Sequence, residues 1–164
     1  MKRLLLCLLM MGLLSGCAVT ETFETVDDEW AQSVVAPMEE LSFSMPKDAA
    51  QQTVEDGSGN RLYLCDGYTL AAQTFPSGDT DGTIRNLCGY DRDSLTVLST
   101  RLGEHKRHDW VWCAAGEGGE QLGRAVLVDD GNYHYCLSVM ADAAVCGTLQ
   151  TVWDGIFASV ALEG

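Results

Sequence analysis

Alternating and continuous apolar runs divide the chain from residue 41 onwards into strand-like segments. Leu41–Met45 alternates apolar and polar residues and ends at Pro46, which is typical of a half-buried strand. Arg61–Cys65 and Tyr68–Phe75 flank Asp66-Gly67, a dipeptide that favours a tight β-hairpin because glycine tolerates the positive φ of such a turn. The pattern therefore opens with one strand and a hairpin.

The second half of the chain predicts four further strands. Gly116–Gly119 and Asp130-Gly131 supply turn residues between the last three of them. Within these strands, Trp110–Cys113 and Ala125–Val128 are apolar at every position instead of alternating, which indicates a sheet that is covered on both faces. The four strands are expected at Leu95–Thr100, Asp109–Ala115, Leu122–Asp129 and Tyr133–Met140.

Two segments have the spacing of helices. After Pro76, Asp79 or Asp81 is expected to cap a short helix, and Gly89 is expected to close it. From about Asp142 to Val160, apolar residues recur on one helical face. The apolar residues on this face are Val145, Leu149, Val152, Trp153, Ile156, Phe157 and Val160.

These elements predict an α+β domain over residues 39–164, with a central antiparallel sheet of six to seven strands. The C-terminal helix is expected to cover one face of the sheet. The short helix and a docked N-terminal segment around Trp30, Val34 and Val35 are expected to cover the other. A body of about 125 residues buries nearly two-thirds of its unfolded surface, which is enough for one core.

The first residues have the composition of an export signal. Lys2 and Arg3 precede an apolar run, Leu4–Leu14, that is shorter than the roughly 20 residues a membrane-spanning helix needs. Leu14-Ser15-Gly16-Cys17 then resembles the lipobox of bacterial lipoproteins. The resemblance implies cleavage after Gly16, which removes residues 1–16, and diacylglycerol on the sulfur of Cys17. An ordinary secretory signal with a chance cysteine is the alternative.

The same resemblance implies where the protein resides. Residues 17–38 would form a lipidated, acidic tether that holds an exported domain at a membrane. Two or three acyl chains at Cys17 give stable attachment, because each buried methylene contributes about 0.8 kcal/mol. The expected location is the outer face of the cytoplasmic membrane or the outer membrane.

The charge of the chain limits the classes of partner that it can bind. The formal net charge is −14, and removal of Lys2 and Arg3 with the leader leaves 8 basic and 24 acidic side chains, a net charge of −16. Such a body is repelled by nucleic acid and by anionic headgroups. We therefore expect no nucleic-acid partner, and we expect membrane attachment through the lipid alone.

Five cysteines remain after Cys7 leaves with the leader and Cys17 carries lipid. Their odd number leaves at least one thiol free or paired between molecules, and no CxxC spacing indicates a zinc site. Cys113 and Cys136 lie in apolar strands and are expected to be small buried hydrophobes. Mostly free, buried thiols are favoured over one disulfide of unassigned pairing. The five cysteines are Cys65, Cys88, Cys113, Cys136 and Cys146.

Three other groups of residues are candidates for sites. Trp110 and Trp112 point to the same face of one strand, where core packing is favoured over the lining of a ligand groove. The basic cluster His105–His108 is expected to be a solvated turn rather than a receptor for an acidic partner. Asp79–Gly82 resembles a fragment of a calcium loop, but helix capping explains it better.

No motif indicates an enzyme, a metal or a cofactor. The glycine-rich stretches lack the setting of a phosphate loop, no GxSxG is present, and the three histidines are not spaced as a metal-ligand pair. Catalysis by Ser–His or Cys–His stays open, because such sites assemble through folding.

From Leu41 to the end, the pattern resembles the PsbP-like sandwich, a fold also found in LpqN-type bacterial lipoproteins. The resemblance implies a central antiparallel sheet between helices and a binding or assembly role rather than catalysis, and it transfers no site residue. It is carried by Leu41–Pro46, by Asp81–Leu95 with its Cys88-Gly89-Tyr90 turn, and by Gly123–Val126, Asn132–Tyr135 and Ile156–Val160.

Three functions follow as hypotheses. The first is a lipid-anchored, non-catalytic module that binds another protein of the cell envelope. The second is a lipoprotein that carries a small ligand near Trp110 and Trp112. The third is an envelope hydrolase, which requires a serine or cysteine beside His105, His108 or His134.

Overall fold

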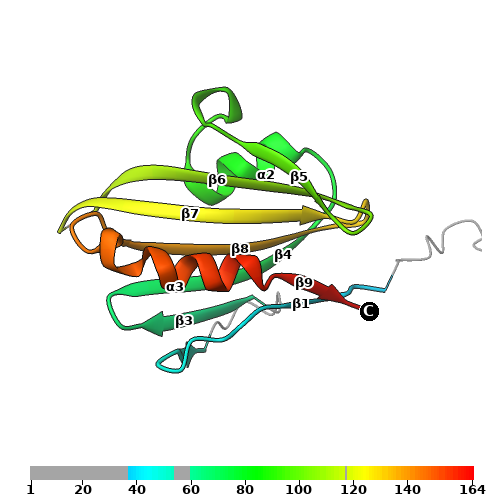
Figure 1. The fold of residues 1–164 in the computed structure, drawn as a ribbon. Coiled ribbons are helices and arrows are strands. Elements are labelled where there is room, and N and C mark those ends of the chain that lie inside the picture. Colours follow the sequence, from blue (N-terminus) through cyan, green and yellow to red (C-terminus); the bar gives the residue numbers. More distant parts are fainter. Residues whose placement is uncertain (1–36, 54–59, 117) are drawn as a thin grey trace, which may run out of the picture. The chain divides into compact units, whose positions relative to one another are not determined.

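A seven-stranded antiparallel sheet forms the centre of the computed structural model, which describes residues 37–53, 60–116 and 118–164. The predicted leader, lipobox and most of the tether lie outside these residues. The strand order is β2-β3-β4-β8-β7-β6-β5, with the short strands β2 and β5 at the edges (Figure 1). The strands are β2 (Ala50–Gln52), β3 (Arg61–Cys65), β4 (Tyr68–Pro76), β5 (Leu98–Leu102), β6 (His105–Gly116), β7 (Gly119–Asp129) and β8 (Tyr133–Asp142).

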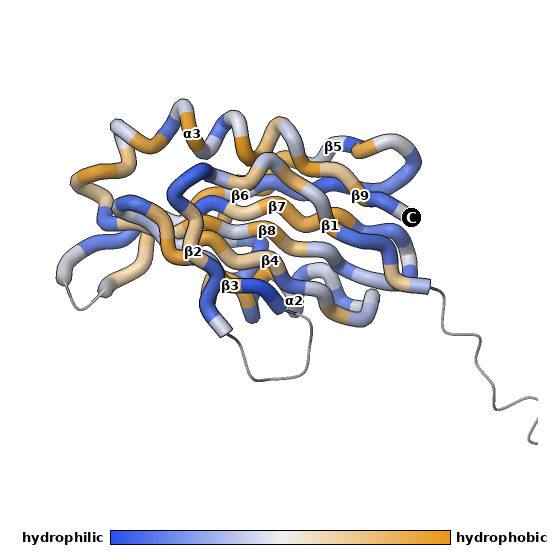
Figure 2. The backbone as a smooth tube through the Cα atoms, turned by 90° about the horizontal axis from the view of Figure 1, so that it is seen from below, coloured by the Kyte–Doolittle hydropathy of each residue, from blue (hydrophilic) through white to orange (hydrophobic). Residues whose placement is uncertain are grey.

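The predicted α+β class with helices on both faces of an antiparallel sheet is confirmed. Helix α3 (Cys146–Ala158) packs on one face and helix α2 (Thr80–Cys88) on the other. Hydropathy follows this arrangement, because the central strands β4, β8 and β7 are largely apolar along their length (Figure 2). The continuous apolar runs in β6 and β7 thus reflect burial on both faces.

The core under α3 is the larger of the two. Trp153, Ile156 and Phe157 of the helix pack against Val126 and Leu137 of the central strands, among other residues. Arg107 fixes the end of this helix, since its guanidinium donates to the Phe157 carbonyl at 3.0 Å. Helix α3 is shorter than predicted, because a turn that includes Ala143 and Ala144 precedes Cys146.

The core under α2 is smaller and rich in tryptophan. Ile84 is fully buried and packs with Trp110, Trp112 and Leu127. The helix begins at the predicted cap, where the Asp79 carboxylate accepts from the Asp81 N–H. It ends at Gly89, whose φ of 80° provides the left-handed C-cap that the sequence predicts.

The strand predicted at Leu41–Met45 is not part of the central sheet. It is the short β1 (Glu40–Ser42), which pairs with β9 (Ala161–Glu163) in a separate two-stranded sheet. Leu41 belongs to the core under α3. No strand was predicted at the positions of β2 and β9. The docked segment that was expected on the α2 face, around Trp30, lies outside the described residues.

Candidate functional site

Trp110 and Trp112 lie in the core under α2. They are 2% and 5% exposed, and their ring centroids are 6.4 Å apart. The Trp112 ring lies directly over the backbone of Gly123, where a Cβ would stand only 2.7 Å from Trp112 Cη2. Both rings are therefore packing residues in this structure, and a ligand-facing role for them stays a prediction.

The basic cluster His105–His108 is not a solvated turn, so that prediction is wrong. These residues begin strand β6, and their side chains alternate between the two faces of the sheet. On the α3 side, Arg107 donates two hydrogen bonds of 2.8 Å to Asp109, which raise the pKa of the guanidinium. The cluster is part of the sheet, with Arg107 half-buried on one face, His108 buried on the other, and Lys106 exposed.

His108 lies on the α2 side in a small polar cluster. It is 8% exposed, and its Nδ1 lies 2.9 Å from the Ser99 hydroxyl. Burial lowers the pKa of His108, and Arg92 lowers it further. Fully buried His134 lies nearby on β8, with Nδ1 2.9 Å from the Thr83 hydroxyl and Nε2 3.9 Å from Asp129 Oδ1.

The structure thus brings a serine beside a histidine, as the hydrolase hypothesis requires. Ser99 and His108 face each other across the β5–β6 pair, and Ser99 is exposed on the surface. The nearby carboxylate of Asp129 accepts the Gly131 N–H and lies beside His134, rather than completing a chain behind His108. The two hollows that border β6 are lined by other residues, so the Ser99–His108 pair does not lie in either of them.

All five described cysteines are free, as predicted, but only Cys136 and Cys146 are buried, so the prediction of mostly buried thiols is wrong. Cys136 is buried as predicted, and burial raises the pKa of its thiol. Cys113 is exposed, so its predicted burial is wrong. Its side chain lies on the α3 face of β6, where Val111 and Ala115 are exposed too, whereas Trp112 on the opposite face is buried.

The outer edge of β6 is open beyond Asp109. Leu102 and His105 close a two-residue turn, so odd-numbered residues of β6 direct their N–H and C=O groups towards β5. Pairing with β5 stops at Asp109, which is opposite Leu98. The main-chain groups of the next odd-numbered residues, Val111, Cys113 and Ala115, therefore point past the end of β5.

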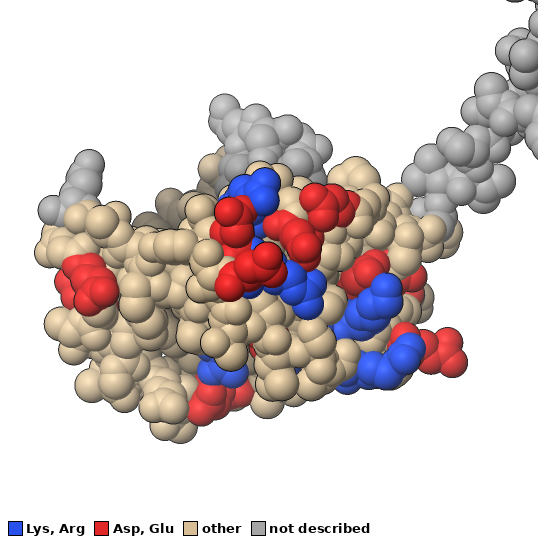
Figure 3. Space-filling model, turned by 90° about the horizontal axis from the view of Figure 1, so that it is seen from above, with Lys and Arg blue, Asp and Glu red and all other residues tan. Residues whose placement is uncertain are grey.

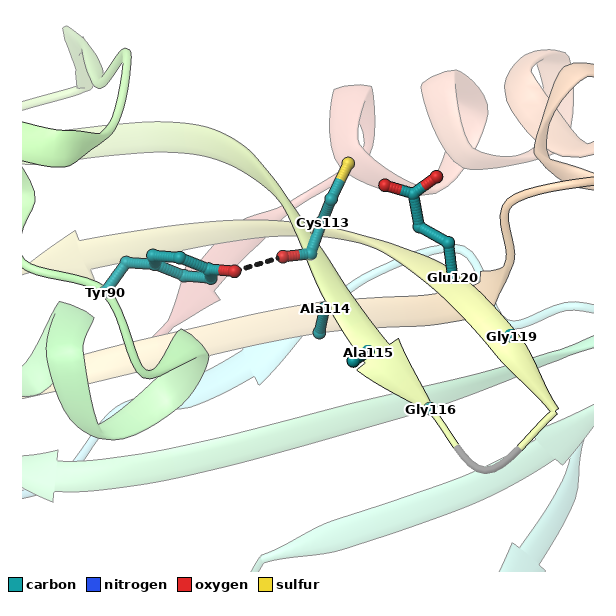
Figure 4. A pocket seen from close by; sticks show the side chains of 7 residues that line it. All are labelled: Tyr90, Cys113, Ala114, Ala115, Gly116, Gly119 and Glu120. Carbon is teal, nitrogen blue, oxygen red and sulfur yellow. Dashed lines mark hydrogen bonds between the residues drawn. The ribbon is translucent and has the colours of Figure 1, made fainter.

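Tyr90 is the residue that contacts this edge. Its hydroxyl donates a 2.6 Å hydrogen bond to the Cys113 carbonyl, as Figure 4 shows. Tyr90 is 41% exposed and borders a hollow of about 470 Å³ at the turn end of the β6–β7 hairpin. Glu120 and Ala115 also line this hollow.

A second hollow lies on the α3 side of the same strands. It encloses about 310 Å³ between the start of α3 and the hairpin. Val111, which is 53% exposed, and Leu122 form its apolar strand wall, and Trp153 and Cys146 face them from the helix. The two hollows flank the open edge, one at the hairpin end and one beside α3.

Charge is distributed unevenly around this region. Ion pairs such as Arg92–Asp81 lie near α2, and on the face seen in Figure 3 charged side chains are fewer towards the end that holds the β6–β7 hairpin. Trp110–Gly116 contains no charged residue, and α3 carries only Asp154, which pairs with Arg124 at 2.6 Å. The strand segment Trp110–Gly116 is therefore an uncharged surface on an acidic protein, bordered by Glu120 at the hairpin end and by the Arg124–Asp154 pair beside α3.

Two kinds of site are missing from the described part of the chain. It contains no group of three or more His, Cys, Asp or Glu residues arranged to hold a metal ion. Within the same residues, no helix has both the length and the apolarity to cross a bilayer.

Solved structures identify the fold. The cyanobacterial PsbP protein CyanoP of Synechocystis matches with a TM-score of 0.57 and 10% identity, over 75% of this chain and 86% of that one. The fold is that of the PsbP-like sandwich. LpqN of Mycobacterium tuberculosis, which is involved in cell envelope biogenesis, matches this sandwich with a TM-score of 0.55 and 11% identity, over 79% of this chain and 86% of LpqN.

A larger protein contains the same sandwich. A crystal structure from Bacteroides thetaiotaomicron matches with a TM-score of 0.52 and 15% identity, over 76% of this chain. The present chain spans 45% of that protein. No protein-family model and no curated protein matches the sequence.

Neither the open edge of β6 nor its contact with Tyr90 was predicted from the sequence. A signal was present, because Trp110–Gly116 is long, uncharged and followed by a partner strand of equal length, whereas the strand before it is short. Such a mismatch exposes an edge. The position of Tyr90 depends on the path of the chain after α2, which no local pattern encodes.

Proposed function

We propose that this protein is a lipid-anchored, non-catalytic module of the bacterial cell envelope that binds another protein. The proposal is supported by the combination of Leu14–Cys17, which resembles a lipobox, with a PsbP-like sandwich. LpqN, which combines this fold with a role in cell envelope biogenesis, supports the same assignment.

The position of the uncharged surface supports a protein partner. Glu39, near the start of the described chain, donates its N–H to Tyr135 Oη at 2.9 Å, at the end of the sheet where β7 finishes. The Gly119 end of β7 lies about 33 Å away, at roughly 3.3 Å per residue. The uncharged surface begins at Val111, about 13 Å along the sheet from Tyr135, and extends away from the start of the described chain to the hairpin, which leaves its far end accessible to a partner.

A small-ligand carrier is the second candidate, and the groove beside α3 favours it. Its volume of about 310 Å³ and its apolar wall of Val111, Leu122 and Trp153 suit a small apolar molecule. Ligand pockets commonly measure about 300–1,000 Å³, so this groove is at the lower limit. The groove is also distinct from the core around Trp110, where the sequence analysis placed the ligand.

Proximity labelling in intact cells tests the proposal. The full-length protein and a Cys17→Ser variant, each fused to the same labelling enzyme, are expressed in the native host. We expect the native form to enrich a reproducible envelope protein and the variant to lose that enrichment with its membrane attachment. Equal labelling by both forms, or no specific protein under several growth conditions, contradicts the proposal.

A separate experiment tests the hypothesis that the protein is a hydrolase. Incubation of the full chain with a fluorophosphonate probe tests Ser99, the serine paired with His108. We expect no labelling above that of a Ser99→Ala variant. Labelling that depends on Ser99 overturns the non-catalytic assignment.

A further inference from the structure

We propose that the open edge of β6, from Val111 to Ala115, accepts an extended, positively charged segment of the partner protein as an added strand. The inference rests on the proposed protein-binding function and names the form of the bound segment. Main-chain hydrogen bonds along an exposed edge give affinity to such complexes, and pockets for alternate side chains give specificity.

The hydrogen-bonding groups required are present in the correct repeat. Val111, Cys113 and Ala115 present N–H and C=O groups on the side where β5 has ended. No described strand pairs with these three residues on that side. Among their outward main-chain groups, the Cys113 carbonyl accepts a hydrogen bond from the Tyr90 hydroxyl within the described part of the chain. The edge therefore offers repeating donors and acceptors over five residues.

The edge also lacks the usual features that prevent strand pairing. Natural edge strands are commonly protected by charged residues, by proline, by bulges or by a covering element. Trp110–Gly116 carries neither charge nor proline, and its pairing with β7 continues without interruption to Gly119. The protection present is the single hydroxyl of Tyr90, which an arriving N–H would replace at the Cys113 carbonyl.

Two side-chain sites lie on the α3 face of this edge. At one end, Val111 opens onto the apolar groove shared with Leu122 and Trp153. At the other end, Glu120 is the direct partner of Ala115 and has no ion pair within the described residues. Residues of an added strand opposite Val111 and Ala115 are four apart and on one face. The bound segment is thus expected to place an apolar and a basic residue four positions apart.

Charge selects among the possible occupants. Glu120 and Asp142 both lie at this end of the sheet, and Arg124 is already paired with Asp154. A second copy would bring a net charge of −16 against the same charge, and the chain's own acidic tether, which includes Glu21 and Glu24, would be repelled as well. A basic segment of another protein has the complementary charge.

Site-specific photo-cross-linking on the full-length, membrane-attached protein tests this inference. The probe is p-benzoylphenylalanine at position 111 on the edge, with position 152 on the outer face of α3 and position 64 on β3 as exposed controls. We expect cross-links from position 111 to map within an extended, net-positive segment of one envelope protein. Positions 64 and 152 are expected to give no such product.

A matched pair of variants separates strand addition from other contacts. Ala115→Pro removes an outward N–H that the chain's own ladder does not use, whereas Ala115→Gly keeps it. We expect Ala115→Pro to lower the yield at position 111 about tenfold, equivalent to the loss of roughly one hydrogen bond and its neighbour. Ala115→Gly is expected to stay within about twofold, because its main chain is unchanged.

Glu120→Lys provides a second variant in case Ala115→Pro disturbs the hairpin, and it is expected to lower the yield similarly by reversing the charge. Cross-links at position 64 or 152 instead of 111, or a yield that neither variant changes, overturn strand addition but leave protein binding intact. A cross-link to a second copy of the chain overturns the named occupant. Absence of cross-links at all three positions contradicts both proposals.

Discussion

Replacing Gly123 by alanine should destabilise the protein, although alanine is normally the better residue in a strand. The Trp112 ring occupies the space where the new Cβ would stand, with Cη2 only 2.7 Å away. Removing a strand glycine stabilises by about 0.5–1 kcal/mol. Forcing this buried ring from its place costs about 2–3 kcal/mol, the upper part of the range for overpacking, because three ring carbons crowd the new Cβ. The expected net loss is about 1–2.5 kcal/mol, or roughly 4–10 °C in Tm.

Guanidinium denaturation followed by far-UV circular dichroism measures this loss. In a Trp112→Leu background the ring is gone, so Gly123→Ala should become neutral or stabilising by about 0.5 kcal/mol. The double-mutant cycle should therefore give a coupling energy of about 2 kcal/mol between the two positions. A Gly123→Ala protein as stable as the native one, or a coupling below about 0.5 kcal/mol, would refute the packing described for the α2 core.

Three further predictions concern other parts of the structure. Asp79→Ala should cost about 1 kcal/mol, because it removes the cap on the Asp81 N–H, and unchanged thermal unfolding would contradict this role. The folded protein lowers the pKa of His108, so its contribution to stability is present above about pH 6.5 and is lost as the pH falls through the folded pKa. His108→Gln should therefore reduce the fall in Tm between about pH 7.5 and 5, and an equal fall would exclude this group as the cause. Tyr90→Phe frees the Cys113 carbonyl and should raise cross-linking from position 111, whereas a lower yield would show that the hydroxyl assists binding.

The sequence was sufficient for most of the fold because its patterns are local. Asp66-Gly67, Asp79 and Gly89 fix a turn, a helix start and a helix end through backbone chemistry that neighbouring residues decide. Continuous apolar runs in β6 and β7 correctly indicated a sheet covered on both faces. The short strands β2 and β9 have no such signature, and their pairing arises from the tertiary arrangement.

The candidate site was harder to predict than the fold. Cys113 lies in an apolar run, but it is exposed because it lies on the face of β6 that is uncovered at this end of the strand, opposite buried Trp112. His108 looked like part of a basic turn, but it is buried in β6 beside Ser99, whereas Lys106, two residues earlier on the same face, is exposed. In both cases the residue's environment depends on which parts of each sheet face other elements cover, which is decided by tertiary packing.

Lipid attachment is the claim on which the proposed function depends most directly. Mass spectrometry of the amino-terminal peptide of the native protein, purified from its own membranes, measures it. We predict a peptide that begins at Cys17 and carries the mass of a diacylglyceryl group on its sulfur. We also predict that a Cys17→Ser protein leaves the membrane fraction. An unacylated amino terminus, or a peptide in which Leu14–Gly16 still precedes Cys17, would contradict it.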